Sequence, residues 1–149
     1  LPVVLGGDHA LSAGSIAGAA AHLAASGQKL GVVWVDAHGD LNTPATSRSG
    51  NVHGMPLAAL LGHGDKAMSS VAGAGGAALR ASNVALVGLR DLDDSERDHI
   101  RKWNLSAFTM RALDERGVRS VMEEAIAIAT KDAGGLWVSF DMDVIDGAE

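Results

Sequence analysis

The stretch GVVWVDAHGD, residues 31–40, decides the fold class. Its first five residues form an unbroken apolar run, which predicts a strand that is buried on both faces of a sheet. The run ends at Asp36, and ionisable residues then follow at two-residue intervals as Asp36, His38 and Asp40. Residues two apart in an extended segment point to the same side, so these three side chains can converge on one point.

Further predicted strands, alternating with segments of helical character, lie on both sides of this stretch in the sequence. Further predicted strands cover residues 2–5, 83–89, 136–140 and, more weakly, 107–110. The segments with helical character are 11–26, 55–62, 93–104 and 118–134. Continuous apolar strands that alternate with helices indicate a parallel sheet covered on both faces. We therefore expect a single α/β domain over residues 1–149, built as three α/β/α layers around a mainly parallel sheet.

Both ends of the chain lie at predicted strands. The sequence begins with LPVVLGGDH, without Met and already within a predicted strand, and it stops at DVIDGAE, just past another. We therefore expect the central fragment of a longer chain, truncated at both ends.

The composition excludes several classes of protein. Hydrophobic residues make up 47% of the 149 residues, which is enough to build a real core. The formal net charge is −6 and no basic residues cluster, which argues against nucleic acid as a partner. The absence of cysteine excludes disulfides and thiolate zinc sites. No apolar run approaches the roughly 20 residues of a membrane span, so we expect a soluble, cytoplasmic protein with no membrane partner.

Acidic and imidazole side chains follow three of the predicted strands. The motif GGDH after the first strand supplies His9, DAHGD follows the second, and Asp141 and Asp143 follow the last. In open α/β sheets, ligands bind at the carboxyl ends of the strands. One such element alone is usually a solvated turn, but three of them at the ends of buried strands are hard to dismiss.

Bringing these carboxylates together has an electrostatic cost. Close carboxylates at a dry sheet edge are unfavourable unless a cation neutralises them. Two divalent cations about 3.5–4 Å apart, with shared carboxylates, would do so. Oxygen ligands with some imidazole and no sulfur favour Mn²⁺ over structural zinc. The residues therefore predict a two-metal centre, of the kind that hydrolyses unreactive carbon or phosphorus centres.

At this point the sequence resembles the arginase, or ureohydrolase, family of binuclear manganese enzymes. The stretches that carry the resemblance are GGDH (6–9), DAHGD (36–40), SGNVHGMP (49–56), GLRDLD (88–93) and SFDMD (139–143). They occur in the family's order and extend over nearly the whole chain. The loop LNTP…SGN (41–51) resembles arginase itself more than agmatinase or formimidoylglutamase. The resemblance thus implies an arginase/deacetylase-like fold and the hydrolysis of L-arginine to L-ornithine and urea.

The resemblance also implies a role for each matching residue. One Mn²⁺ would be held by His9, Asp36, Asp40 and Asp141. The second would be held by Asp36, His38, Asp141 and Asp143, with Asp36 and Asp141 bridging the pair. His53 would shuttle a proton beside the metal centre, so that His53 and Asp40 count as catalytic residues. The substrate's α-carboxylate would contact Asn42, Ser49 and Asn51, its α-ammonium group would contact Asp93, and Glu96 is a further candidate near the substrate.

Three alternatives remain open from the sequence. An agmatinase or another amidinohydrolase of the same family would use the same metal ligands. A deacetylase-type zinc amide hydrolase shares the architecture, but it typically uses one metal and a tyrosine, and this sequence has no Tyr. A non-catalytic metal-binding relative is the third. Family members usually assemble as trimers or hexamers, so the resemblance also implies a homo-oligomer.

Overall fold

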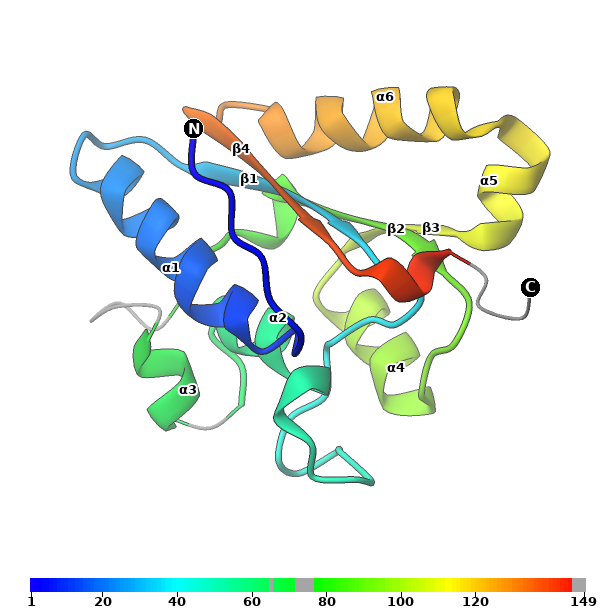
Figure 1. Ribbon diagram of the computed structural model, residues 1–149, viewed down its shortest axis with the longest axis horizontal. Helices are drawn as coiled ribbons and strands as arrows, with labels where there is room; N and C mark the ends of the chain where they lie inside the picture. The colour runs from blue at the N-terminus through cyan, green and yellow to red at the C-terminus, as the bar shows by residue number, and fades with distance from the viewer. Residues whose placement is uncertain (65, 72–76, 146–149) are drawn as a thin grey trace.

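A computed structural model describes residues 1–64, 66–71 and 77–145 of the chain (Figure 1). Its centre is a parallel sheet of four strands in the order β3-β2-β1-β4. The strands are β1 (Leu30–Val35), β2 (Val84–Leu89), β3 (Ser106–Thr109) and β4 (Gly135–Phe140). The predicted strands 31–35, 83–89, 107–110 and 136–140 are therefore confirmed to within one or two residues.

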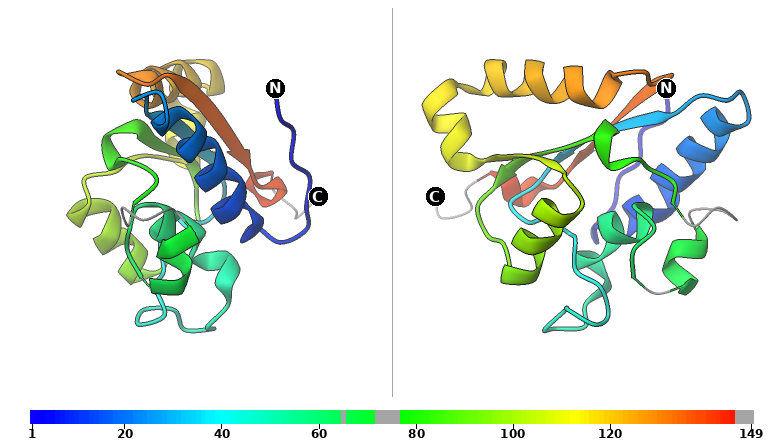
Figure 2. Two further views of the ribbon diagram at one scale, coloured as in Figure 1. Left: turned by 90° about the vertical axis from the view of Figure 1, so that its left-hand side faces the viewer. Right: turned by 180° about the vertical axis from the view of Figure 1, so that it is seen from behind.

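Helices cover both faces of this sheet, so the three-layer α/β/α architecture is confirmed (Figures 1 and 2). One face carries α5 (Met110–Arg116) and α6 (Val118–Thr130). The other carries α1 (Leu11–Ala24), α2 (Pro56–Leu60), α3 (Lys66–Val71) and α4 (Asp94–Lys102). Single 3-10 turns at Val52–Gly54, Ala81–Asn83 and Met142–Val144 complete the described elements.

Strand β1 divides the core into two parts. Val32 and Trp34 are fully buried on the side of α1, α2 and α4, whereas Val33 is fully buried on the side of α6. Gly31 permits a close approach, because a Cβ atom at this position would lie 2.0 Å from the carbonyl oxygen of Ala129 in α6. Burial on both faces explains why the run from 31 to 35 is apolar without interruption.

One expectation about local structure was wrong, and one helix was missed. Residues 2–5 do not form a strand, because no described strand pairs with them; Val3 and Leu5 are exposed instead. This segment runs beside β4 (Figure 2), and residues of both segments line a pocket of about 540 Å³. Helix α5 was not predicted, although Thr109 caps it by accepting a hydrogen bond from the amide of Ala112 at 3.3 Å.

Strand β4 forms an edge of the described sheet, because β1 is its only partner among the described residues. Val138 and Phe140 are each about half exposed at this edge, at 51% and 54%. Within the described ranges, no helix combines the length and apolar character needed to cross a membrane.

Candidate metal centre

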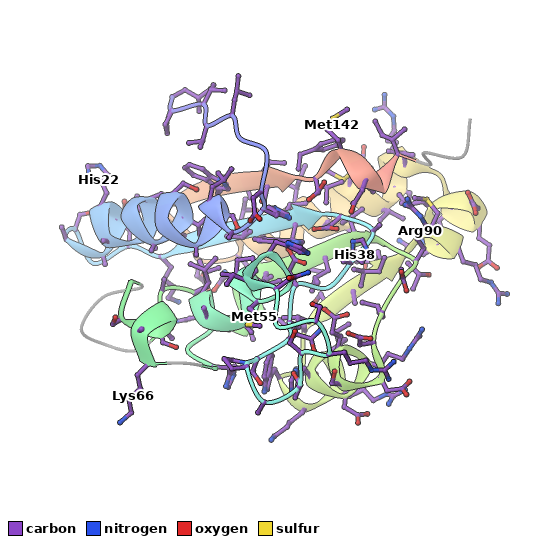
Figure 3. All side chains as sticks on the ribbon, turned by 60° about the horizontal axis from the view of Figure 1, so that its bottom comes forward. His22, His38, Met55, Lys66, Arg90 and Met142 are labelled. Carbon is purple, nitrogen blue, oxygen red and sulfur yellow. The ribbon has the colours of Figure 1, made fainter. Side chains whose placement is uncertain are left out.

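The ionisable residues that follow the strands meet at the carboxyl edge of the sheet. Asp36 follows β1 directly, Asp141 follows β4 directly, and His9 precedes α1. His38 lies at this edge together with Arg90, whereas His22 lies at the far end of α1 (Figure 3). The convergence follows from the parallel topology, which brings the ends of β1 and β4 side by side.

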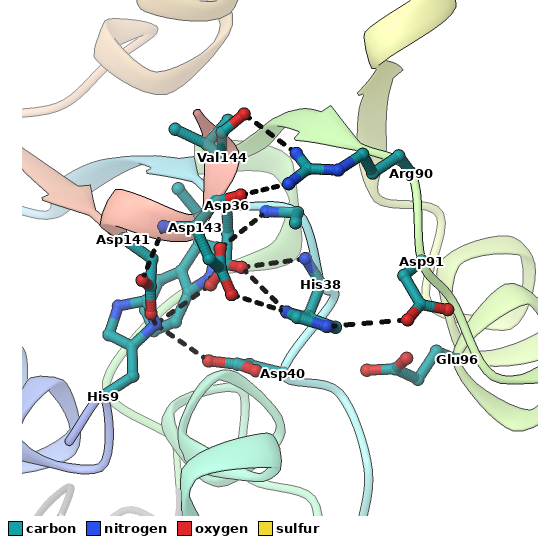
Figure 4. Close-up of polar contacts among 12 residues, drawn as sticks. His9, Asp36, His38, Asp40, Arg90, Asp91, Glu96, Asp141, Asp143 and Val144 are labelled. Carbon is teal, nitrogen blue, oxygen red and sulfur yellow. Dashed lines mark hydrogen bonds and ion pairs between the residues drawn. The ribbon is translucent and has the colours of Figure 1, made fainter. Parts of the chain in front are cut away.

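The Nδ1 atom of His9 is surrounded by carboxylate oxygens (Figure 4). It lies 2.9 Å from Asp36 Oδ2, 3.0 Å from Asp40 Oδ2 and 3.1 Å from Asp141 Oδ2. A single ring nitrogen cannot donate to three oxygens, and none of these contacts has hydrogen-bond geometry: His9 Nδ1 and Asp40 Oδ2 are both buried without a hydrogen-bond partner. Such atoms normally have partners, so their arrangement fits a cation bound among them.

A second group of donors adjoins the first. His38 Nδ1 lies 3.0 Å from Asp143 Oδ2 and 3.5 Å from Asp36 Oδ1. Two triads therefore have ligand atoms within 4.8 Å of one another, His9–Asp36–Asp141 and Asp36–His38–Asp143. Asp36 belongs to both triads and so occupies a bridging position. Asp141 belongs only to the first, and Asp40 belongs to neither, although it contacts His9.

Neighbouring side chains hold these ligands in place. The indole N–H of Trp34 donates to Asp36 Oδ2 at 3.1 Å, and the backbone N–H of His38 donates to Asp36 Oδ1 at 2.8 Å. The imidazole of His9 stacks on Trp34, with ring centroids 4.4 Å apart. Its Nε2 atom lies 2.8 Å from Ser139 Oγ, which leaves Nδ1 facing the carboxylates. Partners of this kind orient the ligands of metal sites.

Trp34 and Ser139 contact the metal-type residues without having been predicted to do so. Trp34 lies in the apolar run that predicts a buried strand and is fully buried, but its contact with Asp36 had no signal in the sequence. For Ser139 the signal was its place two residues before Asp141 in a strand, which puts both side chains on one face.

The charges of this cluster shift its proton affinities. Burial of His9 opposes its protonation, but contacts with Asp36 and Asp40 outweigh burial and raise its pKa to about 10. Burial raises the pKa of Asp40 to about 6 despite the nearby His9. For His38, burial is likewise outweighed, by Asp143 and Asp36, and its pKa is raised. Metal ions bind these groups in their deprotonated forms, so a cation that binds in this cluster has to displace their protons.

The backbone at Asp40 is unusual. Its φ of 52° lies in the left-handed region, which aspartate tolerates better than most residues. Its carbonyl accepts hydrogen bonds from Leu57 and Ala58 at the start of α2, at 3.1 and 3.2 Å. These bonds hold the Asp40 carboxylate, which is 5% exposed, beside His9.

A cavity of about 390 Å³ opens above the two triads. Every residue that the sequence analysis assigned to the site lines it: His9, Asp36, His38, Asp40, Asn42, Ser49, Asn51, His53, Asp93, Glu96, Asp141 and Asp143. A cavity of this size suits a small molecule.

Helix α4 and the segment after Asp40 are joined by hydrogen bonds. Asn42 Nδ2 donates to Asp93 Oδ2 at 2.9 Å. Glu96, only 4% exposed, accepts hydrogen bonds from the backbone N–H groups of Leu41 at 3.1 Å and Asp93 at 3.0 Å. Burial raises the pKa of Glu96, although these two bonds oppose the shift. Both carboxylate oxygens of Glu96 therefore stabilise the backbone around the cavity.

His53 lies in the 3-10 turn before α2 and lines the cavity. Its side chain is 54% exposed, and its Nδ1 atom lies 3.6 Å from Asp8 Oδ2. An imidazole in this position can exchange protons with solvent as well as with a bound molecule.

Comparisons with known proteins agree with this geometry. The sequence model of the Arginase family matches residues 1–149. The arginase of Brevibacillus brevis is 48% identical over 145 residues, and that of Bacillus caldovelox is 43% identical over 148. The crystal structure of arginase from Bacillus cereus superposes with a TM-score of 0.89 at 45% identity. These matches cover 96–99% of the chain but only 47–48% of each relative, so the chain spans about half their length.

Proposed function

This chain belongs to the Arginase family, and from that premise we propose that the full-length protein hydrolyses the guanidinium group of L-arginine to give L-ornithine and urea. The observation that carries the proposal is the pair of triads that share Asp36 at the wall of the cavity. A relative that had lost its function would not need to keep this set of donors.

We assign the two triads to a pair of Mn²⁺ ions. His9, Asp36, Asp40 and Asp141 would hold one ion, and Asp36, His38, Asp141 and Asp143 would hold the other. Ligand oxygens with two imidazoles and no sulfur suit Mn²⁺. When bound, such ions supply a water molecule that is ionised at neutral pH, which the poorly electrophilic guanidinium carbon requires.

Other residues that line the cavity would orient the amino-acid end of the substrate. Asn42, Ser49 and Asn51 are neutral and can donate hydrogen bonds to an α-carboxylate. They do so without a positive charge that would compete with the guanidinium group of the substrate. Asp93 carries the opposite charge to an α-ammonium group. The acidic residues around the triads would attract the guanidinium group of the same molecule.

His53 would protonate the amine that leaves. Loss of ornithine requires a proton on the departing nitrogen, and an imidazole is the side chain that most often transfers protons in catalysis. The half-exposed position of His53 supports this role, because its proton can be replaced from solvent.

The test is a urea assay on the full-length protein after loading with Mn²⁺, with L-arginine and agmatine compared. Agmatine lacks the α-carboxylate, so we expect arginine to be the preferred substrate. Urea from agmatine but not from arginine would replace the proposal with an agmatinase. One zinc ion per chain, with amide hydrolysis in place of urea release, would favour the deacetylase type instead. From the family resemblance we also expect a trimer or hexamer, which sedimentation equilibrium would measure.

A further inference from the structure

Arg90 lies where the segments that carry the second triad meet. It follows β2, and its backbone N–H donates to the carbonyl oxygen of Ala37 at 2.9 Å. The N–H of Asp91 donates to the same oxygen at 3.0 Å. The end of β2 is thereby fixed to the residue between Asp36 and His38.

The side chain of Arg90 reaches the other segment of the triad (Figure 4). Its guanidinium group donates from Nη1 to the carbonyl oxygen of Val144 at 2.8 Å and from Nη2 to the carbonyl oxygen of Asp143. Together with its backbone bond, Arg90 connects the segment of Asp36 and His38 to the segment of Asp143. Val144 is also a core residue, so the turn is held on two sides.

The choice of acceptors is the informative feature. A guanidinium group in an acidic surrounding commonly forms a forked pair with a carboxylate. Here the acceptors are carbonyl oxygens, and across the described part of the chain Arg90 forms no ion pair. The carboxylate of Asp143 consequently stays directed toward His38 Nδ1, at 3.0 Å, and toward the N–H of Ala37, at 3.3 Å.

Gly88 makes this arrangement possible. Its φ is +97°, and a Cβ atom there would lie 2.4 Å from Val144 Cγ2. The pairing of β2 with β3 also shifts register between Val87 and Leu89, around this glycine. An irregularity of this kind redirects the strand that follows it, and Arg90 leaves the strand two residues later.

From these contacts we propose that Arg90 is a positioning residue for the second metal ion. Its hydrogen bonds to the carbonyl oxygens of Asp143 and Val144 hold the Asp143 carboxylate close to Asp36 and His38. The inference rests on the metal centre of the proposed function, but it does not depend on which substrate is hydrolysed. A residue that orients a ligand in this way typically changes metal affinity about 10–100-fold when it is removed.

The test compares Arg90→Met and Arg90→Lys in the full-length, metal-free protein by titration with Mn²⁺. Calorimetry gives the affinity of each site, and electron paramagnetic resonance detects the spin-coupled pair. We expect Arg90→Met to bind the first ion as the wild type does and the second about 10–100-fold more weakly. The affinity of Arg90→Lys for the second ion should lie between those of the wild type and Arg90→Met, because an ammonium group keeps the charge but lacks the planar pair of donors.

Arg111→Met is the matched control, because Arg111 pairs with Glu115 on the surface of α5 and should not change either site. Wild-type affinity at both sites in Arg90→Met would overturn the inference, as would an equal loss at both sites. If Arg90→Met does not fold, Arg90→Lys is judged by the same selective loss. A wild-type protein that binds two ions but releases no urea would refute the proposed activity and leave the role of Arg90 intact.

Discussion

His9 Nδ1 lies 3.1 Å from Asp141 Oδ2, although the two residues come from opposite ends of the chain. Their contact exists because β1 and β4 are parallel neighbours and the segment before α1 returns to the same edge. The first triad therefore forms only when β1 and β4 pair in their native register, so metal binding at this triad also requires the native tertiary fold.

Replacement of Asp141 by Asn tests this triad directly. The amide has one oxygen and no charge, so we expect the affinity for Mn²⁺ to fall by more than the roughly 10–100-fold that loss of an outer-shell partner costs. Urea release should fall with it. Metal content after dialysis and the rate of urea formation are the two measurements. A variant that retains both ions would remove Asp141 from the ligand set.

Replacement of His53 by Asn should separate catalysis from metal binding. His53 belongs to neither triad, so both ions should bind as in the wild type. Loss of a positioned acid or base lowers kcat by about 100- to 10,000-fold. Steady-state kinetics with L-arginine, alongside metal analysis, would check this. Unchanged kcat would assign proton transfer to another group or to solvent.

Replacement of Glu96 by Gln should destabilise the start of α4. A glutamine amide has one oxygen, so it cannot accept hydrogen bonds from the backbone N–H groups of both Leu41 and Asp93 as the carboxylate does. Loss of a helix cap costs about 0.5–2 kcal/mol in the free energy of unfolding. Urea denaturation measures the free energy of unfolding. Asp98→Asn on the same helix is the control, because Asp98 forms only an exposed pair with Arg101 among the described contacts. A higher KM with unchanged stability would instead indicate direct contact with substrate.

Replacement of His63 by Phe should make the protein less sensitive to acid. His63 stacks on Trp103 with ring centroids 3.9 Å apart, and burial, together with His99 and Lys102, lowers its pKa. A lowered pKa means that the folded chain binds this proton more weakly than the unfolded chain does. Stability is thus unaffected above about pH 6.5, the ordinary histidine value, and declines as the pH falls toward the lower folded value.

Phenylalanine keeps the stacked ring but cannot be protonated. Its free energy of unfolding should therefore decline less than that of the wild type between neutral and acidic pH, as measured by urea denaturation of the metal-free protein at each pH. Parallel curves for the two proteins would show that His63 titrates alike in the folded and unfolded chains.

The sequence was sufficient to predict the convergence of the metal-type residues mainly because parallel topology governs it. Asp36 and Asp141 follow neighbouring parallel strands and so reach the same edge, whereas His38 reaches Asp36 through a bend after β1 and not through the alternation that the sequence analysis assumed. Contacts that depend on the exact direction of a side chain could not be predicted. Examples are the hydrogen bond from Trp34 to Asp36 and the hydrogen bonds from Arg90 to carbonyl oxygens, which can be recognised only from the three-dimensional structure.

Two errors in the predicted elements have different causes. The segment 2–5 has strand-like residues, but strand propensity reflects how a segment fits beside its neighbours, and no described strand pairs with it. Helix α5 is only seven residues long and begins directly at the end of a short strand, so a window long enough to detect helical periodicity averages over both.

The outer edge of β4 also has a practical consequence for handling this chain. Its backbone amides and carbonyls lie beside Val138 and Phe140, both half exposed, so another extended polypeptide can add to it as a new strand. Expression of residues 1–149 alone at high concentration therefore invites self-association into insoluble material, and charged substitutions at 138 or 140 are the first means of keeping such preparations dispersed.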